Sequence, residues 1–454
     1  MSSLAVRSIR ELREAYRTGT TTPAEVVART YDELSRTRHN AFISVRPREQ
    51  VLAEVAALSE ERRESPLFGV PFGVKDNIDV AGIATTCACP ELSYVPARSA
   101  PVVERLVSAG AVFIGKTNLD QFATGLSGTR SGYGPVASSR HPGYISGGSS
   151  SGSAVAVGAG LVPLALGTDT GGSGRVPAGF NGIVGLKPSR GLLSLRGVFP
   201  NCPSLDCVSV FTRDTPDAAL ALDILRGFDA EDPYSSPDAG ERLRRLAELG
   251  RPPRVGFVPE KQRAFFGDEE APRAYESLLT RLGAAGITLR ELDFAPYFEA
   301  GENLFDGPWI AERRASLGGF IREHRDAVLP VIRTILDTAD RFSAEDVFRA
   351  QRRLVELKGR ARADFVHVDL LVVPTAPRAY RIAELEAEPI VLNNRLGTYS
   401  YFVNLLDLSA LAIPVASYPN GVPIGATLIG PQRADALLLD VATQFRTVFE
   451  ADRL

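Results

Sequence analysis

The sequence is poor in histidine and cysteine, the residues on which many catalytic and metal sites depend. Its 454 residues include four of each. The cysteines form C-x-C and C-x₄-C pairs that do not repeat at zinc-ligand spacing, and a chain of this length needs no disulfides. The histidines lie outside the glycine-rich segments, so we expect chemistry without imidazole, metal or cofactor. These eight residues are Cys87, Cys89, Cys202, Cys207, His39, His141, His324 and His367.

An excess of one charge and a long apolar run are also absent. The 51 Lys and Arg residues against 54 Asp and Glu residues give a net charge of −3, without the basic surface typical of nucleic-acid binding. The start of the chain becomes charged within seven residues, unlike a signal peptide. The longest apolar stretch, around 153–167, is interrupted by glycines and Pro163. We therefore expect a cytoplasmic protein that binds neither membrane nor nucleic acid, and a small-molecule substrate.

The sequence alternates between short apolar runs and helix-like segments, which favours an α/β fold. Strands are expected at 67–74, 112–115, 183–186, 255–258, 288–292 and 370–373. Helices are expected at 102–109, and after capping residues Thr22 and Ser343. We predict one domain over 1–454, with a catalytic core at about 65–215 and 370–440 and a helical flank at about 215–365.

Two Ser/Gly clusters, at 147–152 and 170–174, are the most unusual feature of the chain. Glycines allow consecutive backbone N–H groups to converge on one point, where an oxyanion can be held. Apolar runs between and after the clusters argue against a flexible linker. A serine nucleophile also needs a base. Lys75 follows an apolar run, so burial would lower its pKa from the usual ~10.4 towards neutrality.

Lys75, the GGSSSGS cluster and the GTDTGGSGR segment followed by GLKP resemble the amidase signature family over about 110 residues. The resemblance implies an amidase signature fold, with a mixed central β-sheet flanked by helices. It also implies a Ser–cis-Ser–Lys triad. Lys75 matches the base, Ser149 the bridging serine with its cis peptide bond, and Ser173 the nucleophile. Ser173 lies 24 residues after Ser149, which is the spacing of the family.

The resemblance further assigns the oxyanion hole to the backbone amides of Thr170, Gly171 and Gly172. In the mechanism that it implies, the lysine draws a proton through the bridging serine, the nucleophile attacks the amide carbonyl, and water hydrolyses the acyl-enzyme. Family members are often homodimers. Asp169 and Arg175 flank the nucleophile and are expected either to brace the loop or to form an ordinary ion pair.

Two motifs point elsewhere and are judged misleading. Residues 110–117 match the Walker A pattern, but Ala-Val-Phe-Ile in its centre reads as the strand itself, whereas a phosphate loop follows its strand. Residues 148–152 match the G-x-S-x-G nucleophile elbow, with Ser150 at its centre and His367 available. That elbow follows a buried strand, and the polar residues 140–146 precede it here.

Within the family, residues 75–82, 116–125, 204–209 and 307–313 look like allophanate hydrolase. Arg313 matches the arginine that binds the substrate carboxylate, and a guanidinium suits a planar anion. Phe305 replaces a tyrosine of that branch, and Gly172 replaces an alanine. We expect no C-terminal accessory domain of the allophanate hydrolase type. The expected activity is hydrolysis of a C–N amide bond in a small carboxylated amide or urea derivative that resembles allophanate. The alternatives are an amidase for another small amide and an ammonia-supplying amidotransferase subunit.

Overall fold

The structure of the chain is a computed structural model that describes residues 8–58 and 63–450. The first seven residues, where no signal peptide is expected, lie outside the described part, as do both ends of the predicted domain 1–454.

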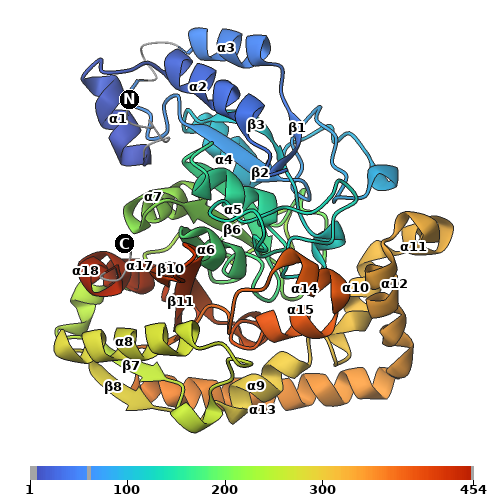
Figure 1. Cartoon of the computed structure of the whole chain (residues 1–454), viewed down its shortest axis with the longest axis vertical. Coiled ribbons are helices and arrows are strands. Elements are labelled where there is room, and N and C mark those ends of the chain that lie inside the picture. Colours follow the sequence, from blue (N-terminus) through green and yellow to red (C-terminus); the bar gives the residue numbers. More distant parts are fainter. Residues whose placement is uncertain (1–7, 59–62, 451–454) are drawn as a thin grey trace.

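A mixed β-sheet runs through the length of the molecule (Figure 1). Within the described residues it has eleven strands, in the order β1-β3-β2-β4-β6-β5-β10-β11-β9-β7-β8. Helices cover both faces, so the predicted α/β class with a mixed central sheet is confirmed. The strands are β1 Phe42–Val45, β2 Pro71–Lys75, β3 Val112–Thr117, β4 Leu164–Asp169, β5 Val184–Lys187, β6 Cys207–Thr212, β7 Arg254–Phe257, β8 Thr288–Glu291, β9 Leu370–Pro374, β10 Ser409–Ser417 and β11 Pro423–Gly430.

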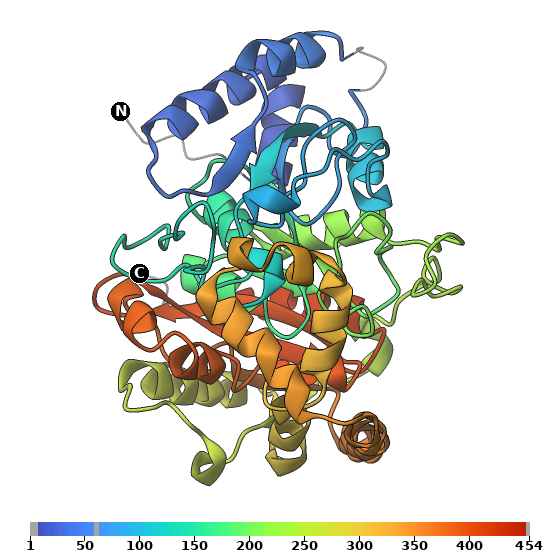
Figure 2. The same cartoon turned by 90° about the vertical axis from the view of Figure 1, so that its right-hand side faces the viewer.

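The helices come from every part of the chain, and α10 to α12 stand together in front of the sheet when the molecule is turned (Figure 2). The α-helices are α1 Ile9–Arg17, α2 Pro23–Arg36, α3 Arg48–Ala56, α4 Pro101–Ser108, α5 Ser151–Gly158, α6 Val176–Asn181, α7 Thr215–Leu225, α8 Glu270–Ala284, α9 Ala295–Glu302, α10 Trp309–Leu317, α11 Phe320–Glu323, α12 Pro330–Asp337, α13 Ala344–His367, α14 Ile382–Ala387, α15 Val391–Leu396, α16 Tyr401–Leu405, α17 Asp435–Gln444 and α18 Arg446–Phe449.

The core forms on both faces of the sheet because its central strands are apolar on both sides. In β4, Leu164 and Leu166 join the apolar cluster that α4, α7 and α17 complete, whereas Ala165 joins the cluster made with α5 and α6. Side chains alternate between the two faces of a strand, so one β4 strand contributes to both cores.

The helix caps expected from the sequence are present. Thr22 and Ser343 accept from the third backbone N–H of α2 and α13 and complete capping boxes. One expected strand begins later than its apolar run, at Pro71 rather than residue 67. Val70 N–H donates to Leu67 O, and Gly69 has φ +66°, so the chain turns there.

The stretch 215–365, expected as a helical flank, also contributes β7 and β8 to the end of the sheet. No helix within the described residues is long and apolar enough to cross a membrane.

Candidate active site

The site is built where two parallel strands end side by side. β2 and β4 pair in parallel, with Val74 opposite Leu166. Lys75 is the last residue of β2, and Thr168 and Asp169 are the last residues of β4. Parallel strands place their carboxyl ends at one edge of the sheet, so Lys75 and Thr168 meet there although they are 93 residues apart in the chain.

Lys75 is completely buried and has two hydroxyl partners. Its Nζ lies 2.8 Å from Ser149 Oγ and 2.7 Å from Thr168 Oγ1. Burial lowers the pKa of Lys75 to about 7, although Asp120 and Asp169 oppose the shift. A substantial fraction of this amine is therefore neutral near pH 7, and a neutral amine can accept a proton.

Ser149 sits just before α5, and the Gly148–Ser149 peptide bond is cis, as the family resemblance implies. The Ser149 carbonyl accepts the N–H of Asp120 at 3.1 Å. A Cβ at Gly148 would collide with the Asp120 carboxylate and would lie 2.7 Å from Gly128 N. Only glycine fits at this position, so the close packing around Gly148 fixes the bridging serine against the lysine.

Ser173 lies in the loop between β4 and α6, and its side chain is almost completely buried. Within the described residues, its hydroxyl forms no hydrogen bond with another protein group. The backbone N–H groups of Thr170, Gly171 and Ser173 likewise have no protein partner in that part of the chain. The loop thus presents a serine hydroxyl among backbone donors that remain available to a ligand.

The Gly172 amide, one of the three assigned to the oxyanion hole, is already engaged. It donates to Asp169 Oδ1 at 2.8 Å, and the Gly174 amide donates to Asp169 Oδ2 at 2.9 Å. Sequence reasoning could not anticipate this because it requires the loop conformation. In this structure the Ser173 amide takes the place of the Gly172 amide among the available donors.

Asp169 and Arg175 form a completely buried pair that braces the loop. Arg175 donates to both Asp169 oxygens, at 2.9 Å each, and also to Ser400 O and Asn404 Oδ1 at 3.0 Å. Burial alone would raise the pKa of Asp169, but the Arg175 charge and hydrogen bonds hold it below its ordinary value. Of the two expected roles, the contacts favour the brace.

Gly172 is required by its surroundings. Its φ is +137°, and a Cβ would collide with Ser400 Oγ. That hydroxyl donates to Gly171 O at 2.8 Å. The glycine that departs from the allophanate hydrolase branch is thus paired with a serine packed against the same loop.

Arg313, on α10, is a buried cation without an anion. Only 2% of its surface is exposed, and it forms no ion pair with any residue in the described ranges. Its Nε donates to Asn201 Oδ1 at 2.9 Å, and its guanidinium lies 4.6 Å from the centre of the Phe305 ring. The Nη1 atom is buried and has no hydrogen-bond partner in the described part of the chain. Such an orphaned guanidinium is typical of a site for a carboxylate.

Three polar residues that sequence reasoning missed complete this region: Thr168, Asn201 and Asp206. Thr168 contacts Lys75, Asn201 holds Arg313, and Asp206 accepts a hydrogen bond from Thr170 Oγ1. Burial raises the pKa of Asp206 to about 6. The signal in the sequence is weak, since single Thr, Asn and Asp residues are common everywhere.

The two misleading motifs have structural explanations. Ser150 Oγ donates to Thr168 O at 2.9 Å and is buried, so it joins α5 to β4. Lys116 lies within β3 and forms a buried ion pair with Asp76 at 3.0 Å. The prediction that the Walker-like segment is a strand is confirmed.

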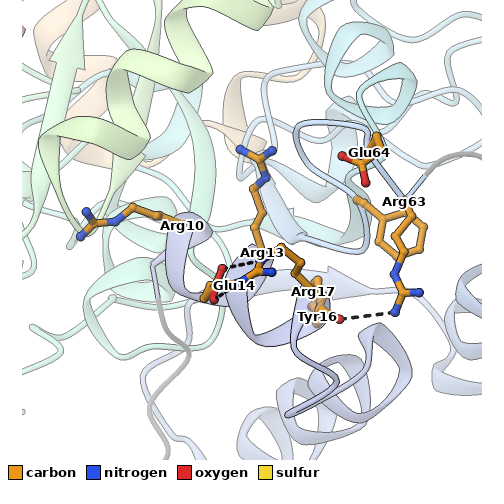
Figure 3. A pocket seen from close by; sticks show the side chains of 8 residues that line it. Arg10, Arg13, Glu14, Tyr16, Arg17, Arg63 and Glu64 are labelled. Atoms are coloured by element: carbon orange, nitrogen blue, oxygen red, sulfur yellow. Dashed lines mark hydrogen bonds and ion pairs between the residues drawn. The ribbon is translucent and has the colours of Figure 1, made fainter.

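The four cysteines are buried and unbridged. A separate hollow lies beside α1 (Figure 3), where Arg17 pairs with Glu14 at 2.6 Å and Arg63 approaches Tyr16 O at 3.4 Å. None of the residues that line it belongs to the site described above, and exposed ion pairs of this kind contribute little stability.

Comparison with known proteins identifies the family to which the chain belongs. The family model described as Amidase matches residues 25–439. Urea amidolyase of Saccharomyces cerevisiae is 41% identical over 416 residues, which cover 90% of this chain and 22% of that protein. A glutamyl-tRNA(Gln) amidotransferase subunit of Methanosarcina acetivorans is 33% identical over 461 residues, covering 93% of this chain and 92% of that protein. The solved structure of Kluyveromyces lactis allophanate hydrolase has a TM-score of 0.90 and 39% identity, covering 98% of this chain and 73% of that one.

The chain spans about a fifth of the length of the urea amidolyases that it matches. The family model, in contrast, extends over most of the chain, and the Methanosarcina amidotransferase protein matches along nearly its whole length. On these grounds the chain belongs to the amidase family.

Proposed function

We propose that this amidase hydrolyses a C–N bond in a small amide or urea derivative that carries a carboxylate, with allophanate as the preferred substrate. The observation that carries the proposal is the buried Nη1 of Arg313, which has no hydrogen-bond partner among the residues of 8–58 and 63–450. A carboxylate in bidentate contact would satisfy it. The resemblance to proteins named urea amidolyase and allophanate hydrolase supports the choice of allophanate.

The proposed chemistry begins with neutral Lys75, which accepts the proton of Ser149 as Ser149 accepts the proton of Ser173. The Ser173 oxygen attacks the amide carbonyl, and the protonated relay then delivers a proton to the leaving nitrogen. Ammonia departs and leaves an acyl-enzyme, which water attacks with the same relay as base. The 2.8 Å contact between Lys75 and Ser149 supports the first transfer.

The developing negative charge on the carbonyl oxygen would be held by backbone amides of the nucleophile loop. Those of Thr170, Gly171 and Ser173 are unengaged by the part of the protein that the structure describes. Fixed backbone donors of this kind need no rearrangement as the charge develops. Since the Gly172 amide is bound to Asp169, its role would be to shape the loop.

Phe305 supports the arginine through its ring but has no hydroxyl to offer the substrate. The ring stacks on the Arg313 guanidinium and lies 4.7 Å from the Tyr401 ring, measured between centroids. The cation–π contact helps hold the guanidinium in one orientation towards its ligand. We expect weaker substrate binding than in a relative with tyrosine at this position.

The test compares allophanate with biuret, in which a neutral carboxamide replaces the carboxylate. Arg313→Ala should raise KM for allophanate by at least about 30-fold, because loss of one partner of a buried charge pair costs about 2–5 kcal/mol. Biuret hydrolysis should hardly change. Arg314→Ala is the matched control, since Arg314 lies on the same helix and pairs with Asp340 at the surface. Equal kinetics on both substrates, unaffected by Arg313→Ala, would exclude the carboxylate site.

An ammonia-supplying amidotransferase subunit remains the second candidate, favoured by the match along 92% of the Methanosarcina acetivorans protein. Ammonia release by the purified chain alone separates the two. Turnover of a small amide without a partner protein supports the amidase, whereas turnover that requires a partner supports the amidotransferase. A homodimer also remains a proposal, which rests on the family resemblance. A single amidase domain and a cytoplasmic location remain proposals that rest on the sequence pattern.

A further inference from the structure

A short turn, residues 201–206, connects the nucleophile loop with the helix that carries Arg313. The turn is closed by backbone hydrogen bonds from Leu205 and Asp206 N–H to Cys202 O, at 2.8 and 2.9 Å. On one side it contacts the loop through Thr170, and on the other it contacts α10. It therefore connects the two parts of the protein that are proposed to bind the two ends of the substrate.

Asp206 is the centre of this turn. Its carboxylate accepts from Thr170 Oγ1, from Asn201 N–H at 2.9 Å and from Cys202 N–H at 3.3 Å. It is 4% exposed and forms no ion pair with the residues that the structure describes. A buried carboxylate without a cation depends on such donors. The donors come from the nucleophile loop and from the turn itself, so the carboxylate joins the two segments.

Asn201 extends the connection to the arginine. Its Oδ1 accepts from Arg313 Nε, while its Nδ2 donates to Phe122 O at 2.8 Å and to Thr124 Oγ1 at 3.2 Å. The amide group is thus fixed in one orientation, with its oxygen towards the guanidinium. Because Asp206 holds the backbone of Asn201, a shift of Asp206 moves the support of Arg313.

Further hydrogen bonds connect the turn with α10 and with the end of β4. Glu312, next to Arg313, accepts from Ser204 N–H at 2.9 Å and from Ser204 Oγ at 2.6 Å. Asn404 Nδ2 donates to both Asp169 O at 2.8 Å and Leu205 O at 3.1 Å. The turn is therefore attached on both sides, to α10 and to the end of β4.

We propose that Asp206 is a positioning residue that fixes the distance between the oxyanion-binding loop, through Thr170, and the carboxylate-binding Arg313, through Asn201. The inference rests on the proposed function. An ionised carboxylate is needed because it can accept from all three donors at once. An asparagine would turn an N–H group towards one of them. A small, rigid substrate that touches both ends requires this separation to be constant.

The test uses three variants and one control on the allophanate and biuret pair. Thr170→Val removes the contact with the loop. Asn201→Leu removes the contact with Arg313, together with the hydrogen bonds to Phe122 O and Thr124 Oγ1, and Asp206→Asn disturbs both ends of the connection. Asp435→Asn is the control. Asp435 is also a fully buried carboxylate that accepts from a backbone N–H and a hydroxyl, both of Ser189, but it contacts neither the loop nor α10. Thermal unfolding verifies that each variant folds.

Thr170→Val should lower kcat for both substrates about equally, by at least about tenfold, as expected for one lost hydrogen bond to a charged group. Asn201→Leu should raise KM for allophanate alone. Asp206→Asn should do both and reduce the preference for allophanate over biuret by at least about tenfold. Asp435→Asn should keep that preference, whatever it does to stability.

The proposal is overturned if Asp206→Asn lowers kcat/KM for both substrates by the same factor, as a merely structural acid would. If Asp206→Asn does not fold, the double-mutant cycle of Thr170→Val and Asn201→Leu decides. Coupling of at least about threefold supports the connection, and additivity within about twofold overturns it. If the wild type shows no preference for allophanate, the proposed function fails instead. The cycle, measured on kcat/KM for whichever amide is hydrolysed, still tests the coupling.

Discussion

Thr168 offers a sharp test of how the lysine base is arranged. Its Oγ1 lies 2.7 Å from Lys75 Nζ and accepts a second hydrogen bond from Asn77 Nδ2 at 3.2 Å. With an amine hydrogen directed at Thr168, the lone pair of neutral Lys75 is free to face Ser149. Thr168→Val keeps the shape of the side chain and removes the acceptor.

The expected magnitude follows from the charge of the donor. A hydrogen bond from a charged group is worth about 1.5–3 kcal/mol and one from a neutral group about 0.5–1.5 kcal/mol. Loss of the acceptor therefore destabilises protonated Lys75 by about 1 kcal/mol more than the neutral amine. At 1.36 kcal/mol per pKa unit, the pKa should fall by about 0.7 unit.

The assay is the pH dependence of kcat/KM. In the wild type, activity should rise with pH through about 7, because Lys75 must lose its proton to act. In Thr168→Val the midpoint should move to lower pH by about 0.7 unit, and the plateau should fall about tenfold because the lone pair is no longer directed. Thr168→Ser, which keeps the hydroxyl, should retain the wild-type midpoint. An unchanged or higher midpoint in Thr168→Val would refute this account of the base.

The other predictions concern the nucleophile, the base, the loop and the substrate end. Ser173→Ala should abolish turnover without lowering the melting temperature, as measured by ammonia release and thermal unfolding. Lys75→Ala should reduce kcat far more than replacement of all four histidines, and a dead histidine-free enzyme would contradict the relay. Gly172→Ala should lower kcat because its Cβ collides with Ser400 Oγ, and addition of Ser400→Ala should restore part of the loss. Phe305→Tyr should lower KM for allophanate by about tenfold, the worth of one added hydrogen bond, and no change in KM would place the substrate elsewhere.

The sequence predicted features that depend on local pattern. The capping boxes at Thr22 and Ser343, and the strand in the Walker-like segment, follow from residues close together in the chain. The family pattern located Lys75 and Ser149, which the structure places within hydrogen-bonding distance. Their catalytic roles remain predictions.

What the sequence did not reveal depends on contacts between distant segments. Asn201 and Arg313 are 112 residues apart, and only the fold brings them together. The engagement of the Gly172 amide by Asp169 depends on the conformation of one loop, which residue types alone do not specify. The proposed positioning role of Asp206 was also missed, because it depends on three hydrogen-bond donors that converge on its carboxylate only in the folded chain.

The most direct test of the central claim is to identify the serine that becomes acylated. The wild-type protein would be treated with a fluorophosphonate probe, and the modified peptide would be sequenced by mass spectrometry. Since Ser173 has an unengaged hydroxyl among unengaged backbone amides of the described chain, the probe should label Ser173, and Lys75→Ala should slow the labelling sharply. Labelling of Ser150, whose hydroxyl is bound to Thr168 O, would contradict the assigned nucleophile and the relay built on it.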